Sequence, residues 1–153
     1  MEKGGYPIKE KIPEIATLLL DAAHRRVSIP WSRVFAHFDG FESHYIDTEV
    51  RFGNAVGDTV THASELLCDP KCAIYSSVIY KKRTRLPGDW FYTNIQIKRR
   101  EYFPVLSNGA NLDVYDPANH KVAMQIATAE RLRVHEHAKQ HYAPGTVFAA
   151  SDL

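Results

Sequence analysis

The amino-acid sequence predicts an α+β fold, in which a winged-helix-like helical body carries a basic β-hairpin and is followed by a C-terminal strand–loop–helix extension. Three observations support this. Three helical patterns follow one another before residue 70, an alternating segment with a basic turn comes next, and a long helical pattern occupies residues 122 to 141. Apolar residues that recur every three or four positions indicate helices, whereas alternating apolar residues indicate strands.

The first helix is predicted to begin at Pro13, because proline suits the first turn of a helix, where its missing N–H costs nothing. Before it, residues 1 to 12 are expected to form a loose arm rich in glycine and proline. Ile15 and Leu19 then follow at helical spacing, and the basic residues up to Arg26 suit the negative end of the helix dipole.

Two further helices are predicted before the hairpin. The first covers residues 28 to 38, with Ser28 as its N-cap and Pro30 in its first turn. The second runs through residues 57 to 69, where apolar residues form one inner stripe. A short strand is expected between them, at residues 45 to 52.

The segment that follows has the pattern of a β-hairpin. Residues 73 to 80 are rich in β-branched and aromatic residues, and residues 90 to 97 have the composition of a returning strand. Pro87 and Gly88 indicate a turn between them. Three helices packed behind a two-stranded ribbon is the plan of a winged-helix domain, so the tip is expected to act as a wing on a sugar–phosphate backbone. The cations of this tip are Lys81, Lys82, Arg83 and Arg85.

We expect a single domain over residues 1 to 153, since this length can bury a core without disulfides or metal. Its body is predicted to span residues 13 to 97, its C-terminal extension residues 98 to 142, and its tail residues 143 to 153. The extension is expected to pack on the body, because its helix alone cannot bury its own apolar stripe.

The composition restricts the classes of partner. The net charge of +1 gives no global attraction to nucleic acid or to an anionic membrane, so any such attraction must come from local clustering. The two cysteines, Cys68 and Cys72, form no disulfide framework and lack a second pair for a zinc site. The N-terminus has no apolar signal core, and no apolar run is long enough to span a bilayer. A cytoplasmic protein without membrane contact is therefore expected.

A basic cluster is the main candidate site. Between residues 81 and 100 seven cations face a single acid, Asp89. Such clusters contact phosphates in nucleic-acid-binding proteins, although a solvated hairpin tip that protects a sheet edge is the alternative interpretation. The predicted contact residues are Lys81, Lys82, Arg83, Arg85, Lys98, Arg99 and Arg100.

Several short motifs follow the order of a known family. Residues 27 to 29 read V-S-I, where the family has a V-T-Y-like helix start. Residues 54 to 57 read N-A-V-G, which is similar to R-A-V-G at the head of its recognition helix, and residues 69 to 70 read D-P where the family has N-P. With these motifs, residues 13 to 91 resemble the DNA-binding domain of O6-alkylguanine-DNA alkyltransferases and their alkyltransferase-like relatives. The resemblance implies a winged-helix fold and binding of duplex DNA.

The departures from this family bear on the chemistry. The family's P-C-H-R, whose cysteine accepts the alkyl group, is replaced by Y-S-S-V at residues 75 to 78. Ser77 lies about where the cysteine would fall, but a serine without an adjacent base is a poor nucleophile. Asn54 stands where the family has the arginine that fills the gap left by a flipped base. We therefore expect a protein that contacts DNA without catalysis, with Asn54 as a further contact residue and no cofactor.

Two alternatives involve metals. Asp47 with Glu49, or Asp113 with Asp116, offer carboxylates for a metal-dependent hydrolase or nuclease, although no motif supports such an enzyme. On the last predicted helix, histidines at i and i+4 can share one face and bind a divalent metal. No third ligand is indicated there, and we expect no metal.

A third alternative is a protein-interaction module without nucleic acid. The region from Trp31 to Phe52 and the run of residues 90 to 92 are rich in aromatic residues. Most of these are expected in the core, and any that are exposed would form a homodimer or partner patch. Such a protein would be an inhibitor, an immunity factor or an accessory subunit.

Overall fold

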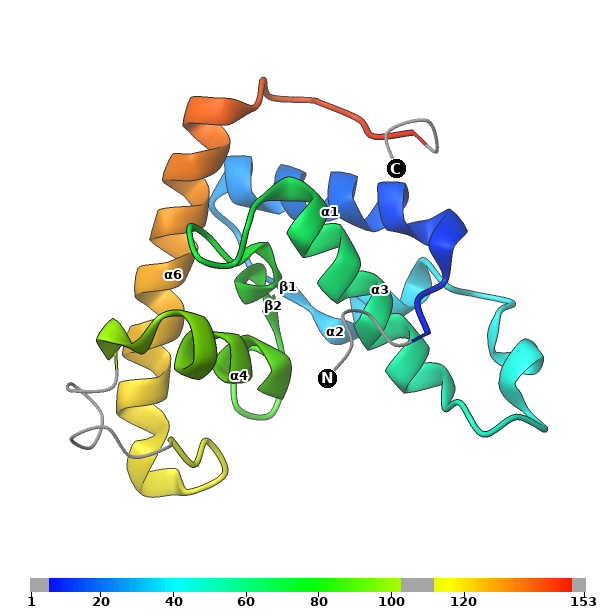
Figure 1. Cartoon of the computed structure of the whole chain (residues 1–153), viewed down its shortest axis with the longest axis horizontal. Helices are drawn as coiled ribbons and strands as arrows, with labels where there is room; N and C mark the ends of the chain where they lie inside the picture. Colours follow the sequence, from blue (N-terminus) through cyan, green and yellow to red (C-terminus); the bar gives the residue numbers. More distant parts are fainter. Residues whose placement is uncertain (1–5, 103–111, 150–153) are drawn as a thin grey trace.

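The computed structural model describes residues 6–102 and 112–149, which are mostly helical and include one parallel two-stranded sheet (Figure 1). This confirms the predicted α+β class. The α-helices are α1 (Ile12–Arg25), α2 (Trp31–Ala36), α3 (Phe52–Leu67), α4 (Asp89–Lys98) and α6 (His120–His141). The strands are β1 (Ile29–Pro30) and β2 (Ile79–Tyr80). Short 3-10 helices lie at Lys9–Lys11, Glu42–Tyr45, Tyr75–Val78, Arg100–Tyr102 and Pro117–Asn119.

The first and third predicted helices are confirmed as α1 and α3. Helix α1 has proline in its first turn and is followed by the C-cap Arg26, whose left-handed backbone (φ 56°) brings the Val27 N–H within 3.1 Å of the Ala22 carbonyl. Helix α3 begins at Phe52, five residues before the predicted start. The predicted strand at residues 45 to 52 is therefore wrong, since it ends inside this helix and begins in a 3-10 turn.

The start of the second helix differs from its prediction. Ser28 is exposed and does not cap it, and the N-cap position belongs to Pro30. Ile29 and Pro30 instead form β1, which pairs in parallel with Ile79 and Tyr80 of β2. A two-residue strand tolerates proline because few of its N–H groups are needed in the ladder.

The predicted β-hairpin does not form. Residues 89 to 98, expected to include the returning strand, are helix α4, and the basic tip is a loop that connects β2 to this helix. Asp89 occupies the first turn, where a carboxylate is favoured by the helix dipole. Phe91 and Ile95 are buried one helical turn apart, whereas Ile97 is exposed. The spacing of the apolar residues therefore fits a helix as well as a strand.

The other half of the predicted hairpin, residues 73 to 80, is mostly not a strand. Tyr75–Val78 form a 3-10 helix, and only Ile79 and Tyr80 form β2. From Ala73 to Ile79 every side chain except that of Ser76 is buried, so the alternation expected of a half-exposed strand is absent.

The core consists of two clusters, and α6 contributes to both. The larger cluster packs α1 against α3 and receives Val134 and Ala138 from α6. The smaller one packs α4 against Ala123 and Ile126 of the same helix. In Figure 1, α6 runs along one side of the molecule past α4 and the end of α1. The predicted packing of the C-terminal extension on the body is thus observed.

The C-terminal segment from residue 143 to residue 149 passes along α1 (Figure 1). The backbone N–H of Phe148 donates to Thr17 Oγ1 at 2.9 Å, and the Phe148 ring packs on Tyr142. Within the described part of the chain, none of the helices has the length and apolar character needed to cross a bilayer.

Candidate functional site

A groove of about 1120 Å³ lies between α3 and the loop that leads from β2 into α4. Lys81, Lys82 and Arg83 line one side, and the glycine-rich start of α3 lines another. Aromatic side chains from α2 and α4 form part of its wall, among them Trp31, Phe35 and Trp90. The volume is slightly above the usual range for small-molecule pockets, and aromatic walls are typical of recognition sites.

The loop from Lys81 to Gly88 is held in shape by its own backbone. The N–H of Lys81 donates to the Leu86 carbonyl at 2.9 Å, and the N–H of Arg85 donates to the Lys81 carbonyl at 2.7 Å. Closing the loop requires a positive φ of 66° at Arg85. Leu86 is buried in the smaller core cluster, and His120 Nε2 lies 2.7 Å from the Thr84 carbonyl oxygen. The loop is therefore anchored at its end and along one side.

Lys81 differs from the other cations of the loop because an acid neutralises it. Its ammonium lies 3.1 Å from an Asp89 carboxylate oxygen, and the Tyr115 hydroxyl donates to the other oxygen. Partial burial raises the pKa of the Asp89 carboxyl, but the hydrogen bonds from Tyr115 and Lys81 outweigh it and hold the pKa below its usual value. Lys81 thus serves mainly to close the loop onto α4.

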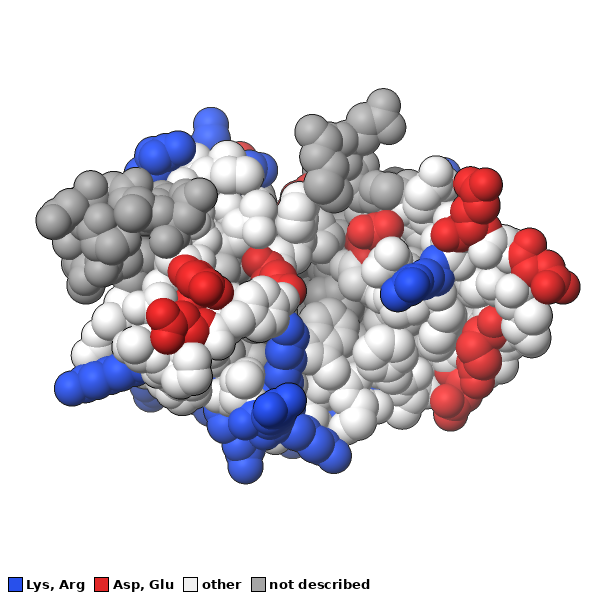
Figure 2. Space-filling model, turned by 90° about the horizontal axis from the view of Figure 1, so that it is seen from below, with Lys and Arg blue, Asp and Glu red and all other residues white. Residues whose placement is uncertain are grey.

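The remaining three cations of the loop are available to a ligand. Lys82, Arg83 and Arg85 are exposed, and none of them forms an ion pair with a carboxylate in residues 6–102 or 112–149. The Arg85 guanidinium lies 5.1 Å from the centre of the Tyr80 ring, which orients it without neutralising it. Figure 2 shows one face of the molecule on which Lys and Arg side chains gather beside a hollow, while Asp and Glu side chains lie both next to this group and along the other end.

Helix α3 lines the groove with two glycines and with Asn54, Asp58 and Thr61, and it contributes no lysine or arginine. A side chain at Gly53 or Gly57 would meet only open space, so neither glycine is required by a neighbouring atom. Asn54 is exposed between them and lines the groove. Asp58 also lines it, but its carboxylate accepts the Tyr6 N–H at 2.8 Å and thereby holds the N-terminal segment.

The second predicted run of cations does not join the first. Arg99 is buried: its guanidinium donates to the Cys72 carbonyl at 2.9 Å and is ion-paired with Glu130, so the prediction that Arg99 contacts phosphate is wrong. Lys98 and Arg100 are exposed, but Lys98 is the last residue of α4 and Arg100 comes two residues later. Because α4 has ten residues at about 1.5 Å each, they lie about 15 Å beyond the loop. The seven cations therefore do not form one surface.

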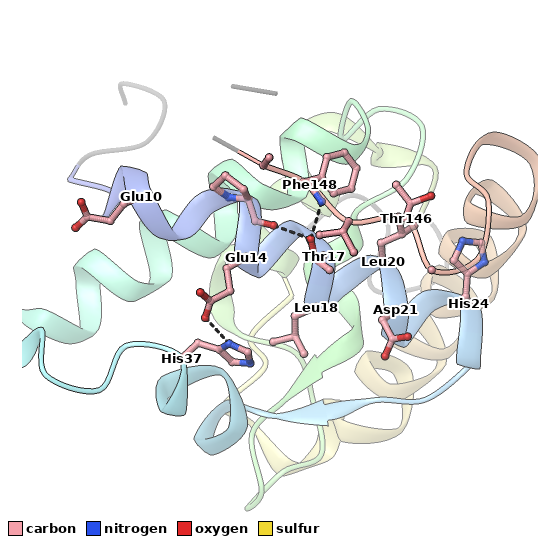
Figure 3. A pocket seen from close by; sticks show the side chains of 14 residues that line it. Glu10, Glu14, Thr17, Leu18, Leu20, Asp21, His24, His37, Thr146 and Phe148 are labelled. Carbon is pink, nitrogen blue, oxygen red and sulfur yellow. Dashed lines mark hydrogen bonds and ion pairs between the residues drawn. The ribbon is translucent and has the colours of Figure 1, made fainter. Parts of the chain in front are cut away.

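A second cavity of about 600 Å³ lies between α1 and the C-terminal segment (Figure 3). Its lining includes the carboxylates of Glu10, Glu14 and Asp21 and contains no lysine or arginine. The Glu14 carboxylate lies 2.6 Å from His37 Nδ1. Burial raises the pKa of Glu14, but hydrogen bonds from His37 and Lys11 outweigh it and lower the pKa. The absence of cations makes this cavity unsuited to a polyanion.

The aromatic residues around α2 are largely core. The Phe52 ring is surrounded by the rings of Phe35, Phe38 and Tyr45, at centroid distances of 6.0, 6.4 and 5.8 Å. These rings belong to the larger core cluster or are partly buried against it, which accounts for much of the aromatic content of the region, and Trp31 and Phe35 also line the groove.

The polar groups proposed for metal chemistry have other partners. The Asp113 and Asp116 carboxylates accept backbone N–H groups of the following turns at 3.0 and 2.9 Å. The rings of His137 and His141 stack at 4.4 Å, and the hydroxyl of buried Tyr75 lies 2.8 Å from His137 Nδ1. Among the residues that the structure describes, no three His, Cys, Asp or Glu side chains converge in a way that would hold a metal ion.

Sequence reasoning missed the aromatic wall of the groove. Trp31 and Trp90 belong to segments that were assigned to the core and to a strand, and only the helical form of residues 89 to 98 brings Trp90 to the groove. Comparisons with known proteins found no matching family model, no matching curated protein and no matching solved structure.

Proposed function

We propose that this protein binds duplex DNA without catalysing a reaction, and that the loop from Lys81 to Arg85 contacts the phosphates. One observation carries the proposal: Lys82, Arg83 and Arg85 are exposed on one short loop and have no acidic partner in the described part of the chain. Phosphate neutralisation by such side chains supplies most of the affinity of non-specific DNA binding. The likeness of residues 13 to 91 to alkyltransferase-like DNA-binding domains is further support.

Specificity for sequence is expected to be weak. The wall of the groove formed by α3 offers Asn54 but no lysine or arginine. An asparagine amide both donates and accepts, so it can hydrogen-bond a base edge or a phosphate. With one such group on this wall, the affinity depends mainly on the loop. A lesion or modified base is a possible target only through the family resemblance.

The salt dependence tests the number of contacts. Three phosphate contacts predict a slope of about −2.7 for the logarithm of the association constant against the logarithm of the salt concentration. Between 50 and 200 mM salt the affinity should then fall about 40-fold. Fluorescence anisotropy with a labelled duplex of 20 base pairs measures this slope.

The loop is tested by reversing its charge. We expect the triple variant Lys82→Glu, Arg83→Glu and Arg85→Glu to lose at least about tenfold in affinity, because the contacts are lost and repulsion replaces them. The matched control reverses three exposed lysines on other elements, Lys9, Lys121 and Lys139. Both variants have the same net charge, so a loss of binding that is equal in the two would refute the loop as the contact surface.

A protein-interaction module is the second candidate, and the charges of the groove favour it. Glu49 and Asp58 line the groove together with the basic loop, beside the aromatic wall. A peptide that carries both signs of charge and an apolar side chain would complement this surface. If the wild type and both variants all fail to bind the duplex at 50 mM salt, the DNA-binding proposal is rejected. The protein-interaction module then replaces it. Light scattering after size exclusion then tests whether the partner is a second copy of the chain.

A further inference from the structure

The turn that follows α3 brings the protein's two cysteines into one compact unit. Cys68 is the C-cap residue of α3, and Cys72 comes four residues later. Asp69 organises the turn: its carbonyl accepts the Cys72 N–H at 2.8 Å and the Ala73 N–H at 3.2 Å. Its carboxylate accepts the Lys71 N–H at 2.8 Å. The backbone between the two cysteines is therefore hydrogen-bonded almost throughout.

Both cysteines contact the same carbonyl and differ in access. Cys68 is half-buried and Cys72 is exposed, and both are free thiols. The Cys68 thiol donates to the Asp69 carbonyl at 3.4 Å, and the Cys72 N–H donates to the same carbonyl at 2.8 Å, so the Cys68 thiol lies close to Cys72. Burial raises the pKa of the Cys68 thiol. The exposed Cys72 is thus the thiol that meets a reagent from solvent first.

Contacts from two other elements hold this turn in place. The buried guanidinium of Arg99 donates to the Cys72 carbonyl at 2.9 Å. Two residues later, the Ile74 N–H donates to the buried carboxylate of Glu130 at 2.8 Å. Since Arg99 and Glu130 also form an ion pair, the position of Cys72 relative to the end of α3 is set before any reaction. Groups held in proximity react as if at high concentration.

We propose that Cys68 and Cys72 form a redox-active dithiol, which small-molecule disulfides of the glutathione class convert into an intramolecular disulfide. This site lies outside the groove and does not depend on the proposed DNA binding. Its features are an exposed attacking thiol, a half-buried second thiol that shares the Asp69 carbonyl with the Cys72 N–H, and a turn that is anchored by Arg99 and Glu130.

The reaction is a pair of thiol–disulfide exchanges. The Cys72 thiolate attacks one sulfur of the small-molecule disulfide, whose S–S bond breaks, and one small thiolate leaves and takes up a proton. The Cys68 thiol loses its proton to solvent and attacks the Cys72 sulfur of the mixed disulfide, so that the second small thiolate leaves. The two hydrogens of the protein thiols end on two small-molecule thiols, and one S–S bond replaces another.

The test uses the full chain in buffers of oxidised and reduced glutathione, followed by acid quenching, alkylation and mass spectrometry of the intact protein. We expect a monomer that has lost two hydrogen atoms, carries no glutathione and resists alkylation. The Cys68→Ser variant should instead accumulate one glutathione on Cys72, and the Cys72→Ser variant should react much more slowly. A wild-type chain that carries bound glutathione or forms a disulfide-linked dimer at every buffer ratio would overturn the proposal.

A second measurement tests the anchored turn. The Asp69→Ala variant removes the carboxylate that fixes the turn and should lower the equilibrium constant for the internal disulfide about tenfold, or about 30 mV for this two-electron couple. The matched control is Asp116→Ala, because that carboxylate also accepts a backbone N–H in a turn but lies far along the chain. Circular dichroism checks that both variants are folded. Equal equilibrium constants for the internal disulfide in the two variants would refute the role of the turn in favouring that disulfide.

Discussion

At the scale of single residues, the buried carboxylate of Glu130 joins segments that are far apart in the sequence. It accepts the Ile74 N–H, forms an ion pair with Arg99, and lies 3.6 Å from the Arg133 side chain. The i, i+3 spacing of Glu130 and Arg133 is typical of an exposed ion pair on a helix surface, yet Glu130 is fully buried. An ion pair taken out of water contributes little by itself, but removing one partner leaves a buried charge uncompensated.

The Glu130→Gln variant should therefore lose up to about 3–5 kcal/mol of unfolding free energy, since the Arg99 guanidinium keeps its charge, loses its buried carboxylate and retains the exposed Glu101 at 3.5 Å. Replacing both residues by apolar ones of similar size, as in Arg99→Met with Glu130→Leu, should cost less than the single change. Urea denaturation followed by circular dichroism measures both. As a control, Glu136→Gln changes an exposed carboxylate on the same helix and should be almost neutral. Equal stability of Glu130→Gln and Glu136→Gln would contradict the role of the buried pair.

The Glu14 carboxyl should make the stability of the folded protein depend on pH, in the direction that its pKa shift determines. Its pKa is lowered in the folded protein because hydrogen bonds from His37 and Lys11 outweigh the effect of burial. A lowered folded-state pKa contributes stability above the pKa of the unfolded chain, and this stability is lost as the pH falls through the folded-state value.

The stability difference between wild type and Glu14→Gln should thus be present at pH 7 and disappear as the solution is acidified below about pH 4. Since the carboxylate is partly exposed, the difference should be within about 0.2–1 kcal/mol. Urea unfolding at a series of pH values checks this. Glu10→Gln, at a nearby carboxylate without an ion-pair partner in the described residues, should show a smaller change. A difference that grows on acidification would have the wrong sign.

At the scale of secondary-structure elements, the end of α1 is set by a residue with an unfavourable backbone. Arg26 has φ 56° and ψ 42°, and its N–H bonds the carbonyls of Ala22 and Ala23. This left-handed conformation closes the helix, and glycine adopts it without the steric penalty that a Cβ brings.

The Arg26→Gly variant should accordingly gain about 0.5–1 kcal/mol, because relief of strain exceeds the extra entropy of the unfolded chain. The neighbouring Arg25→Gly variant, inside the last helical turn, should lose about 1 kcal/mol. Thermal unfolding by calorimetry gives both shifts. If the two glycine variants shifted the melting temperature in the same direction, the account of this helix end would be incorrect.

Helix α4 shows where local pattern is ambiguous. Its residues are β-branched and aromatic at positions that satisfy an alternating period, and a strand would put Ile95 and Ile97 on one face. The structure buries Ile95 and leaves Ile97 exposed by 63%. The choice depends on the contacts of Phe91 and Ile95 with Ile126 of α6, which lies about thirty residues further along the chain. Tertiary packing overrides propensity in such segments.

At the scale of the whole molecule, α6 holds the two core clusters together. Val134 and Ala138 belong to the cluster around α1 and α3, whereas Ala123 and Ile126 belong to the cluster around α4. Without this helix neither cluster would be fully buried, because the elements around each cluster would expose an apolar face to solvent.

We predict that a chain ending at Asn119 does not fold cooperatively. Removing α6 takes five buried apolar side chains and the buried ion-pair partner of Arg99 from the core. A chain ending at Tyr142 is the control and should still fold, since the segment from 143 to 149 adds only the contacts of Phe148 and its neighbours with α1. Far-ultraviolet circular dichroism during urea unfolding distinguishes the two. A sharp transition in the shorter chain would show that α6 is dispensable.

Within the sequence alone, the apolar periods of α1, α3 and α6 determined three long helices and their buried faces, because a helix of that length must bury one stripe. The sequence alone also determined that the cations between residues 81 and 85 lie close together, because these residues are near neighbours in the chain. The tertiary structure alone decided that residues 89 to 98 are helical, that Arg99 is buried against Glu130, and that Trp31 and Trp90 line one groove. These outcomes depend on contacts between residues far apart in the chain, whose energies a local pattern does not contain.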